Sequence, residues 1–186
     1  MTPPIVLTGA TGTGKTAVSL ELAALLGGEI LCADSRQLYR GFDVATGKPT
    51  KDERARVPHH GFDTLDPAET SSAGAYVRAT APLLESVTAR GALPILVGGT
   101  GLYLRALHGG LAEIPEIDEA VRTRVRARLR EDGPEALHAE LGALDAELAA
   151  RLAPRDGQRI ARGLEVALGT GRPLSEWQRA GAREPA

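Results

Sequence analysis

Residues 9–16 read GATGTGKT and fit the pattern G-x-x-x-x-G-K-[ST]. They follow a short apolar run, Ile5-Val6-Leu7, and open a helical stretch. In such a strand–loop–helix unit, successive backbone N–H groups and the positive helix end point at one anion. Lys15 adds a compact charge, and the Thr16 hydroxyl can hold Mg²⁺. The stretch therefore predicts a phosphate-binding loop in a chain that binds a di- or triphosphate.

Two other interpretations of these glycines exist. They could form only a turn, or they could belong to a dinucleotide site, since Gly12-x-Gly14-x-x-Ala17 fits that motif and Asp34 lies about where a ribose-binding acid would. In the dinucleotide motif, however, the first glycine directly follows the strand, whereas Gly12 comes later. Lys15 would have no role there. The phosphate loop is therefore the favoured interpretation.

The composition is that of an ordinary globular protein, with 186 residues, 42% hydrophobic and 25% charged. The net charge of −2 gives no overall basic field, so an RNA partner would need a local patch. Cys32 is the only cysteine, which excludes an internal disulfide and fits a reducing cytoplasm. We expect no signal peptide and no membrane contact, because the first strand begins at once and no long apolar run occurs.

Strands and helices alternate in the first part of the chain. Expected strands are 5–8, 29–33, about 61–65 and 93–97; expected helices are 15–26, 73–89 and 101–108, with a polar segment over 40–58. This order predicts an α/β fold, a P-loop kinase-like parallel sheet with helices on both faces. Gly9, Asp34 and Gly98 fall at carboxyl ends of strands, where such sheets bind ligands.

From about residue 114, apolar residues recur only at helical spacing, with breaks at 132–134 and 153–154. This predicts a small all-helical subdomain, so the expected divisions are a core over 1–113, a helical insertion over 114–175 and a frayed tail over 176–186. Two groups of arginines are expected to share helix faces that are either solvated or anion-binding. These are Arg122, Arg126 and Arg130, and Arg155, Arg159 and Arg162.

Basic residues show a bias that bears on the loop. Of the 22 Lys and Arg residues, only those at 15, 48 and 51 are lysines, which suggests that a compact ammonium is wanted in the loop. Asp34 is the strand-end acid near the loop, because the strand 93–97 ends in Gly-Gly-Thr. Asp34 has two interpretations. It is a helix N-cap or a group that hydrogen-bonds the ligands of Mg²⁺, or it is a base that faces the reacting end of the phosphate ligand.

Three further stretches, in order after the loop, resemble the tRNA dimethylallyltransferase family. They are DSRQLYRGFDVATGKPT (34–50), VGGTGLYLRAL (97–107) and QRIARGLEVALGTGRPLS (158–175). Members transfer a dimethylallyl group from dimethylallyl diphosphate to the exocyclic N6 amine of the adenosine 3′ of the anticodon in tRNA, and release diphosphate. The resemblance implies this prenyltransferase activity, with Mg²⁺ as cofactor, in a cytoplasmic monomer.

The resemblance also implies roles for individual residues. Asp34 would be the general base, with Lys15 and Thr100 as further catalytic residues, and Thr16 would hold the metal. The donor would be bound by Gly9, Ala10, Thr11, Gly12, Thr13, Gly14, Lys15 and Thr16. The tRNA would be contacted by Asp34, Ser35, Arg36, Gln37, Thr100, Arg122, Gln158, Arg159, Ile160, Ala161 and Arg162, which makes 114–175 a tRNA-binding insertion.

The chemistry of the acceptor agrees with these roles. An adenine amine is a poor nucleophile, so the departure of diphosphate must be stabilised by Lys15, the loop N–H groups and Mg²⁺. Asp34 then needs only to take a proton as the new bond forms. The target base must also leave its stack. Tyr39 and Tyr103 are candidate stacking partners, with core packing as the alternative for either.

Other functions remain as alternatives. Family members continue through a G-Y-R-Q-like motif that residues 176–186 do not contain, so the chain is expected to be a fragment or a shortened form. The alternatives are a small-molecule kinase with the same loop, an adenylate isopentenyltransferase that uses free AMP and, because that motif is missing, an inactive tRNA-binding module.

Overall fold

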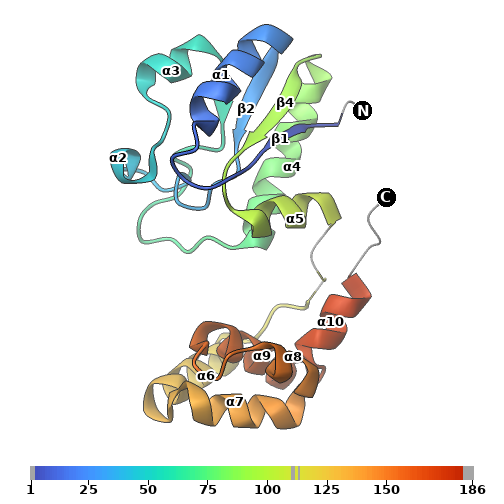
Figure 1. Cartoon of the computed structure of the whole chain (residues 1–186). Coiled ribbons are helices and arrows are strands. Elements are labelled where there is room, and N and C mark those ends of the chain that lie inside the picture. Colours follow the sequence, from blue (N-terminus) through green and yellow to red (C-terminus); the bar gives the residue numbers. More distant parts are fainter. Residues whose placement is uncertain (1–2, 110–111, 113, 182–186) are drawn as a thin grey trace. The chain divides into compact units, whose positions relative to one another are not determined.

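The computed structural model describes residues 3–109, 112 and 114–181. These residues form two compact units, 1–108 and 109–186, which divide close to the boundary expected at 113 (Figure 1). The elements of the first unit are β1 (Ile5–Leu7), α1 (Lys15–Leu26), β2 (Gly28–Cys32), α2 (Asp43–Thr46), α3 (Lys51–Arg56), β3 (His59–His60), α4 (Ala73–Ala89), β4 (Leu93–Val97) and α5 (Gly101–Gly109).

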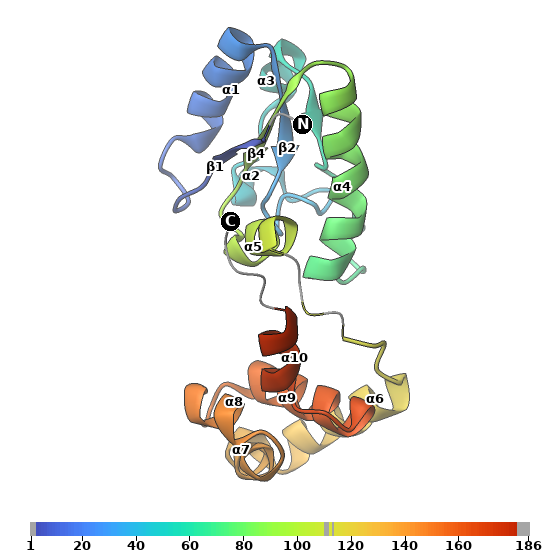
Figure 2. The same cartoon turned by 90° about the vertical axis from the view of Figure 1, so that its right-hand side faces the viewer.

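A parallel sheet in the order β1-β4-β2-β3 forms the centre of the first unit. Because strand side chains alternate between faces, neighbours in sequence enter different cores. Ile30 packs in the cluster that contains Leu20 and Ala23 of α1, whereas Leu31 packs in the one that contains Tyr76 of α4. Figure 2 shows α1 and α4 on opposite sides of the strands. The predicted α/β sheet with helices on both faces is thereby confirmed.

The strand expected over 61–65 was wrong. The structure has a strand at His59–His60, and Leu65 forms only an isolated bridge with Tyr39. Gly61 and Asp63 have φ angles of 78° and 56°. These left-handed conformations end an extended strand, whatever apolar residues flank them.

The segment 40–58, expected to be merely polar, contains the short helices α2 and α3. A capping box begins α3: the Thr50 side chain accepts from the Glu53 N–H, and the Glu53 carboxylate accepts from the Thr50 N–H. The sequence Thr-x-x-Glu is the usual signature of such a helix start. It was the signal that could have located α3.

The second unit contains helices alone, as expected. They are α6 (Glu119–Glu131), α7 (Gly133–Leu144), α8 (Ala146–Arg151), α9 (Gly157–Thr170) and α10 (Leu174–Gly181). In its core, α9 packs against α7 and α6, and Gly163 of α9 also faces Leu148 of α8. A Cβ atom added to Gly163 of α9 would lie 2.8 Å from a Leu148 methyl and 2.9 Å from a Leu141 methyl. The missing side chain at position 163 therefore sets the closeness of these helices.

The expectation of a frayed tail from residue 176 was wrong as far as Gly181, which ends α10. Leu174 is buried, and Trp177 packs against the core of the second unit. The indole N–H of Trp177 donates to the Thr170 hydroxyl at 3.3 Å, and the Arg172 guanidinium lies 4.6 Å from the ring centroid. These contacts hold the helix in place. Residues 182–186 lie outside the described residues.

We expect Asp145→Ala to destabilise the second unit by about 2–4 kcal/mol, since it removes a helix cap and leaves a buried N–H unpaired. The buried Asp145 carboxylate accepts from the Leu148 N–H at 3.0 Å and from the Ser175 N–H at 2.8 Å. Urea unfolding at pH 7 measures the loss. The matched control is Asp132→Ala, because Asp132 begins α7 without a side-chain cap bond. Equal stability of the two variants would contradict this role.

The contribution of Asp145 to the stability of the second unit should depend on pH. Burial raises the pKa of Asp145, but the hydrogen bonds from Ser175 and Leu148 outweigh it and lower the pKa below 3.8. Stabilisation is therefore complete above the ordinary pKa and is lost as the pH falls through the lowered one. The stability difference between the wild type and Asp145→Ala should accordingly shrink in acid.

Candidate active site

Three loops meet at the carboxyl edge of the sheet, after β1, β2 and β4. Backbone hydrogen bonds join them: the Gly98 N–H donates to the Leu7 carbonyl at 3.2 Å, and the Ala33 N–H donates to the Val97 carbonyl at 2.8 Å. The Thr100 N–H donates to the Ala33 carbonyl at 3.2 Å. The parallel order of the strands thus brings the phosphate loop, Asp34 and the Gly-Gly-Thr turn to one place.

Glycine is required where these loops touch. A Cβ atom on Gly98 would lie 2.2 Å from both the carbonyl carbon and the oxygen of Ala33. One on Gly99 would lie 3.3 Å from the Gly9 carbonyl oxygen and 3.9 Å from Asp34 Oδ2. Gly99 therefore stands between the start of the phosphate loop and the Asp34 carboxylate.

The phosphate loop depends on two glycines in left-handed backbone, Gly12 at φ 83° and Gly14 at φ 81°. Gly14 precedes α1 and makes no side-chain cap bond, so the first N–H groups of the helix stay available to an anion. The Lys15 ammonium reaches back over the loop and donates to the Ala10 carbonyl at 2.6 Å. The Thr13 hydroxyl donates to the same oxygen at 2.9 Å. The loop thus offers amide groups and an ammonium to an anion, which suits a diphosphate.

Thr16 is half-buried at the start of α1. Its carbonyl, rather than its hydroxyl, accepts the hydrogen bond from the Ser19 hydroxyl at 2.8 Å. The Thr16 hydroxyl therefore remains available for a metal ion. Mg²⁺ typically takes one or two protein ligands and completes its shell with phosphate oxygens and water. The donor set of this loop fits such an ion.

Asp34 begins a turn rather than a helix, which disfavours the N-cap interpretation. Its Oδ1 accepts from the Arg36 N–H at 2.9 Å, and its carbonyl accepts from the Gln37 N–H at 3.2 Å. These bonds fix the carboxylate near Gly99, with Oδ2 on that side. A fixed carboxylate with one oxygen free of the turn can accept a proton from a bound substrate.

Thr100 positions the residue after Asp34. Its Oγ1 accepts from the Ser35 N–H at 2.9 Å and donates to the Ser35 hydroxyl at 3.2 Å. Sequence reasoning had placed Thr100 only in contact with substrate. The structure adds that it joins the β4 and β2 loops, a contact that the sequence separation of these residues concealed.

The two tyrosines considered as base-stacking partners differ in their surroundings. Tyr103 is buried and stacks on Tyr76, with centroids 4.1 Å apart and an interplanar angle of 11°. Burial raises the pKa of Tyr103. Tyr39 is only half-buried, and its hydroxyl accepts from the Ser71 N–H at 3.0 Å. Tyr103 is therefore a core residue, as the alternative held. Burial likewise raises the pKa of Cys32 to about 12, which disfavours the thiolate form.

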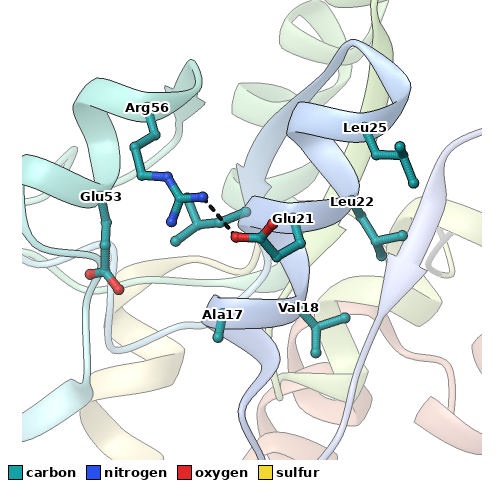
Figure 3. Close-up of a pocket in the computed structure, with 8 residues that line it drawn as sticks. Ala17, Val18, Glu21, Leu22, Leu25, Glu53 and Arg56 are labelled. Carbon is teal, nitrogen blue, oxygen red and sulfur yellow. Dashed lines mark hydrogen bonds and ion pairs between the residues drawn. The ribbon is translucent and has the colours of Figure 1, made fainter.

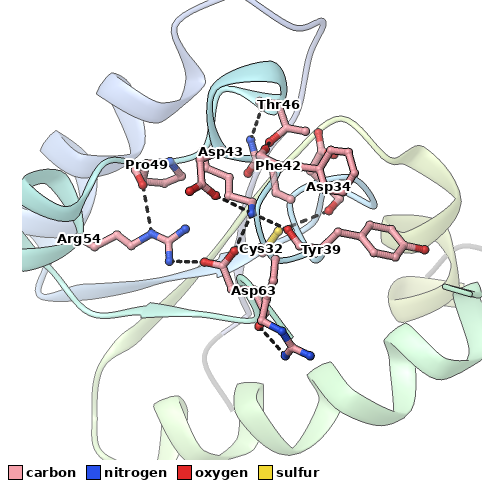
Figure 4. A network of polar contacts seen from close by, with 12 residues as sticks. Cys32, Asp34, Tyr39, Phe42, Asp43, Thr46, Pro49, Arg54 and Asp63 are labelled. Carbon is pink, nitrogen blue, oxygen red and sulfur yellow. Dashed lines mark hydrogen bonds and ion pairs between the residues drawn. The ribbon is translucent and has the colours of Figure 1, made fainter. Parts of the chain in front are cut away.

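A buried ammonium holds the segment after Asp34, and sequence reasoning missed it. The Lys48 side chain is 1% exposed, and its Nζ donates to the Tyr39 carbonyl at 2.5 Å, to Asp43 at 2.9 Å and to Asp63 at 2.6 Å (Figure 4). Arg54 also pairs with Asp63, at 2.7 Å. Burial lowers the pKa of Lys48, but the hydrogen bonds from Lys48 to Asp63 and Asp43 outweigh it and raise the pKa. Lysine is scarce in this sequence, and that scarcity was the signal that could have singled out Lys48.

The remaining candidate tRNA contacts belong to the second unit. Gln158, Arg159 and Arg162 are exposed on α9, whereas Ile160 and Ala161 are buried in its core. The side chains of Ile160 and Ala161 therefore pack the helix. Arg155 lies before α9, so it does not share a helical face with Arg159 and Arg162, which corrects that expectation.

Arginines of α6 and α9 meet around one buried acid. The Glu165 carboxylate lies 3.7 Å from Arg126 Nε and 3.6 Å from Arg162 Nη1. Arg122 lies one turn before Arg126 and pairs with Glu119 at 3.5 Å. Arg122, Arg126 and Arg162 form a basic surface on the packed helices α6 and α9. Glu165 neutralises part of its charge and holds Arg126 and Arg162 near each other.

A hollow of about 430 Å³ lies between α1 and α3 and differs in character from the loops described above (Figure 3). Its walls include Val18, Leu22 and Leu25. Its charged lining residues are Glu21, Glu53 and Arg56, and Arg56 pairs with Glu21 at 2.7 Å. This hollow offers no free charge to an anionic substrate. Within the described ranges, no cluster of three His, Cys, Asp or Glu residues could hold a metal, and no helix is long and apolar enough to cross a membrane.

Two families match parts of this sequence. The family described as IPP transferase matches residues 37–186, and the one described as isopentenyl transferase matches residues 5–58. A tRNA dimethylallyltransferase of Rhodopseudomonas palustris is 52% identical over 173 residues, which are 93% of this chain and 54% of that protein. One of Methylococcus capsulatus is 49% identical, over 94% and 56%. The chain spans about half the length of the curated relatives it matches.

Solved structures show the same similarity. A eukaryotic dimethylallyltransferase, whose structure is described as acting on tRNA, superposes with a TM-score of 0.77 at 28% identity, over 98% of this chain and 45% of that one. The tRNA isopentenylpyrophosphate transferase of Bacillus halodurans gives a TM-score of 0.57 at 40% identity, over 91% and 56%.

Proposed function

This chain belongs to the IPP transferase family, and on that premise we propose that it transfers a dimethylallyl group from dimethylallyl diphosphate to the N6 amine of the adenosine 3′ of the anticodon in tRNA. One observation carries the proposal. The Gly99 position lies next to both the first residue of the phosphate loop and the Asp34 carboxylate. An anion-binding loop and a proton acceptor therefore face one small space, as prenyl transfer requires.

On the donor side, the chain supplies positive charge where the leaving group develops negative charge. The N–H groups of the loop and the Lys15 ammonium bind the diphosphate and stabilise its departure. Lys15 would exchange its bond to Ala10 for bonds to phosphate oxygens. Thr16 would hold Mg²⁺, which when bound neutralises further charge on the leaving diphosphate.

On the acceptor side, Asp34 orients the amine and removes its proton as the carbon–nitrogen bond forms. The turn from Asp34 to Gln37 fixes the carboxylate, and Thr100 fixes Ser35 beside it. The basic surface of α6 and α9 would contact RNA phosphates, which position an RNA without reading its sequence. The monomeric state and the cytoplasmic location stay predictions.

A label-transfer experiment separates this function from its alternatives. The chain is incubated with labelled dimethylallyl diphosphate or labelled ATP, and with tRNA or AMP as acceptor. Label that passes from dimethylallyl diphosphate to tRNA supports the proposal. Label that passes only from ATP would indicate a kinase, and AMP as the sole acceptor would indicate an adenylate isopentenyltransferase. Salt-dependent tRNA binding without any transfer would indicate a binding module.

Replacement of Lys15 by alanine tests the donor site. We expect Lys15→Ala to weaken the binding of inorganic diphosphate about 10- to 100-fold, because a charge-assisted hydrogen bond is lost. Calorimetric titration measures the affinity. Lys51→Ala is the matched control, since Lys51 is an exposed lysine of α3 outside the loop. An unchanged affinity in Lys15→Ala would remove the loop from donor binding.

A further inference from the structure

We propose that a cavity beside Asp34 binds a second nucleotide of the acceptor RNA, the one next to the target adenosine in the strand. This inference rests on the proposed function. The cavity measures about 490 Å³ and is called the Phe42 cavity below. Its walls are Arg36, Tyr39, Phe42, Ala45, Thr46 and Pro67.

The walls combine an aromatic surface with an unneutralised positive charge. Phe42 is 48% exposed, although it is a large apolar residue. Its ring lies edge-on to Tyr39, with centroids 6.4 Å apart at 71°, so the ring pair forms an aromatic corner rather than a closed stack. Arg36 is exposed, and within the described ranges it has no acidic partner. An exposed ring beside a free guanidinium suits an unstacked base with its phosphate.

The cavity is held open by bonds that do not involve its occupant. Gln37 Nε2 donates to the Thr46 and Gly47 carbonyls at 2.9 and 3.3 Å, and the Thr46 hydroxyl donates to the Phe42 carbonyl at 2.5 Å. The Lys48 ammonium donates to the Tyr39 carbonyl. Figure 4 shows Tyr39, Phe42 and Thr46 beside this network. A wall fixed in advance loses less entropy on binding than a mobile loop would.

The position of the cavity favours a nucleotide over the isoprenoid chain of the donor. Arg36 follows Asp34 by two residues, so their Cα atoms are at most about 7 Å apart. A nucleotide joined to the target adenosine by one phosphodiester can reach across that distance. The isoprenoid chain carries no charge, and its diphosphate is bound by the phosphate loop. It therefore gives no reason for a free guanidinium at Arg36.

The test uses the whole chain and a fluorescent RNA hairpin that carries the target adenosine in its loop. We expect Phe42→Ala to weaken hairpin binding about 5- to 150-fold, the range of one lost base–aromatic stack. Phe42→Trp should restore the affinity. The matched control is Val44→Ala on α2, the short helix that Phe42 directly precedes, because Val44 is 97% exposed and does not line the cavity. Its affinity should equal that of the wild type.

Two abasic hairpins identify the occupant, each lacking the base on one side of the target. The effect of Phe42→Ala should vanish on one of them and persist on the other. If Phe42→Ala weakened the binding of both abasic hairpins, the inference would be overturned. Equal binding of Phe42→Ala and wild type to the intact hairpin would overturn it as well. Weaker binding of dimethylallyl diphosphate by Phe42→Ala, with inorganic diphosphate unaffected, would also overturn it and assign the cavity to the isoprenoid. A wild type that binds donor but no hairpin would instead overturn the proposed function.

Discussion

Asp34→Asn should lower the rate of prenyl transfer about 10²- to 10⁴-fold, the usual worth of a positioned general base. The amide has nearly the same shape as the carboxylate, and its carbonyl oxygen can still accept from the Arg36 N–H. The turn after β2 should therefore persist. What is lost is the ability to take a proton from the amine. A single-turnover assay with labelled dimethylallyl diphosphate and tRNA measures this directly.

The affinity for the donor separates a chemical defect from a structural one. Binding of inorganic diphosphate should be the same in Asp34→Asn and wild type, because the phosphate loop supplies those contacts. Asp52→Asn is the control, since Asp52 is exposed on α3 and outside the site. If Asp34→Asn transferred the prenyl group at the wild-type rate, another group would be the proton acceptor, and the acceptor side of the mechanism would have to be reassigned.

The sequence predicted the parallel sheet and its binding edge because those features rest on local patterns. Buried parallel strands are nearly continuous apolar runs, and the phosphate loop has a fixed spacing. Once these are placed, topology alone brings Gly9, Asp34 and Gly98 to one edge. The helical unit was equally visible, since its apolar residues recur at helical spacing.

Contacts between distant residues could not be predicted in the same way. Thr100 hydrogen-bonds Ser35 across 65 positions, and nothing local to either residue indicates the other. The left-handed backbone at Asp63 likewise depends on its surroundings, because Lys48 and Arg54 bind its carboxylate. The wrong strand over 61–65 and the overlooked Lys48 thus share one cause, a polar network formed by residues far apart in sequence.

Gly98→Ala should destabilise the first unit by about 3 kcal/mol or more, at or above the upper range for overpacking. The added methyl would lie 2.2 Å from Ala33 carbonyl atoms, and those atoms are backbone. Ala33 is itself held by hydrogen bonds to Val97 and Thr100. Neither partner can move without breaking the junction of β2 and β4. Relief of the clash would therefore displace Asp34 along with Ala33.

The neighbouring glycines supply a graded control for this prediction. Gly99→Ala meets the Gly9 carbonyl oxygen at 3.3 Å and should cost less, whereas Gly101→Ala meets no atom within 4 Å and should leave stability almost unchanged. Thermal unfolding and diphosphate binding should be measured on all three variants. A Gly98→Ala variant as stable as Gly101→Ala would show that the β2–β4 junction is looser than described. In that case, close contact of the two loops would no longer explain how Asp34 is fixed beside the phosphate loop.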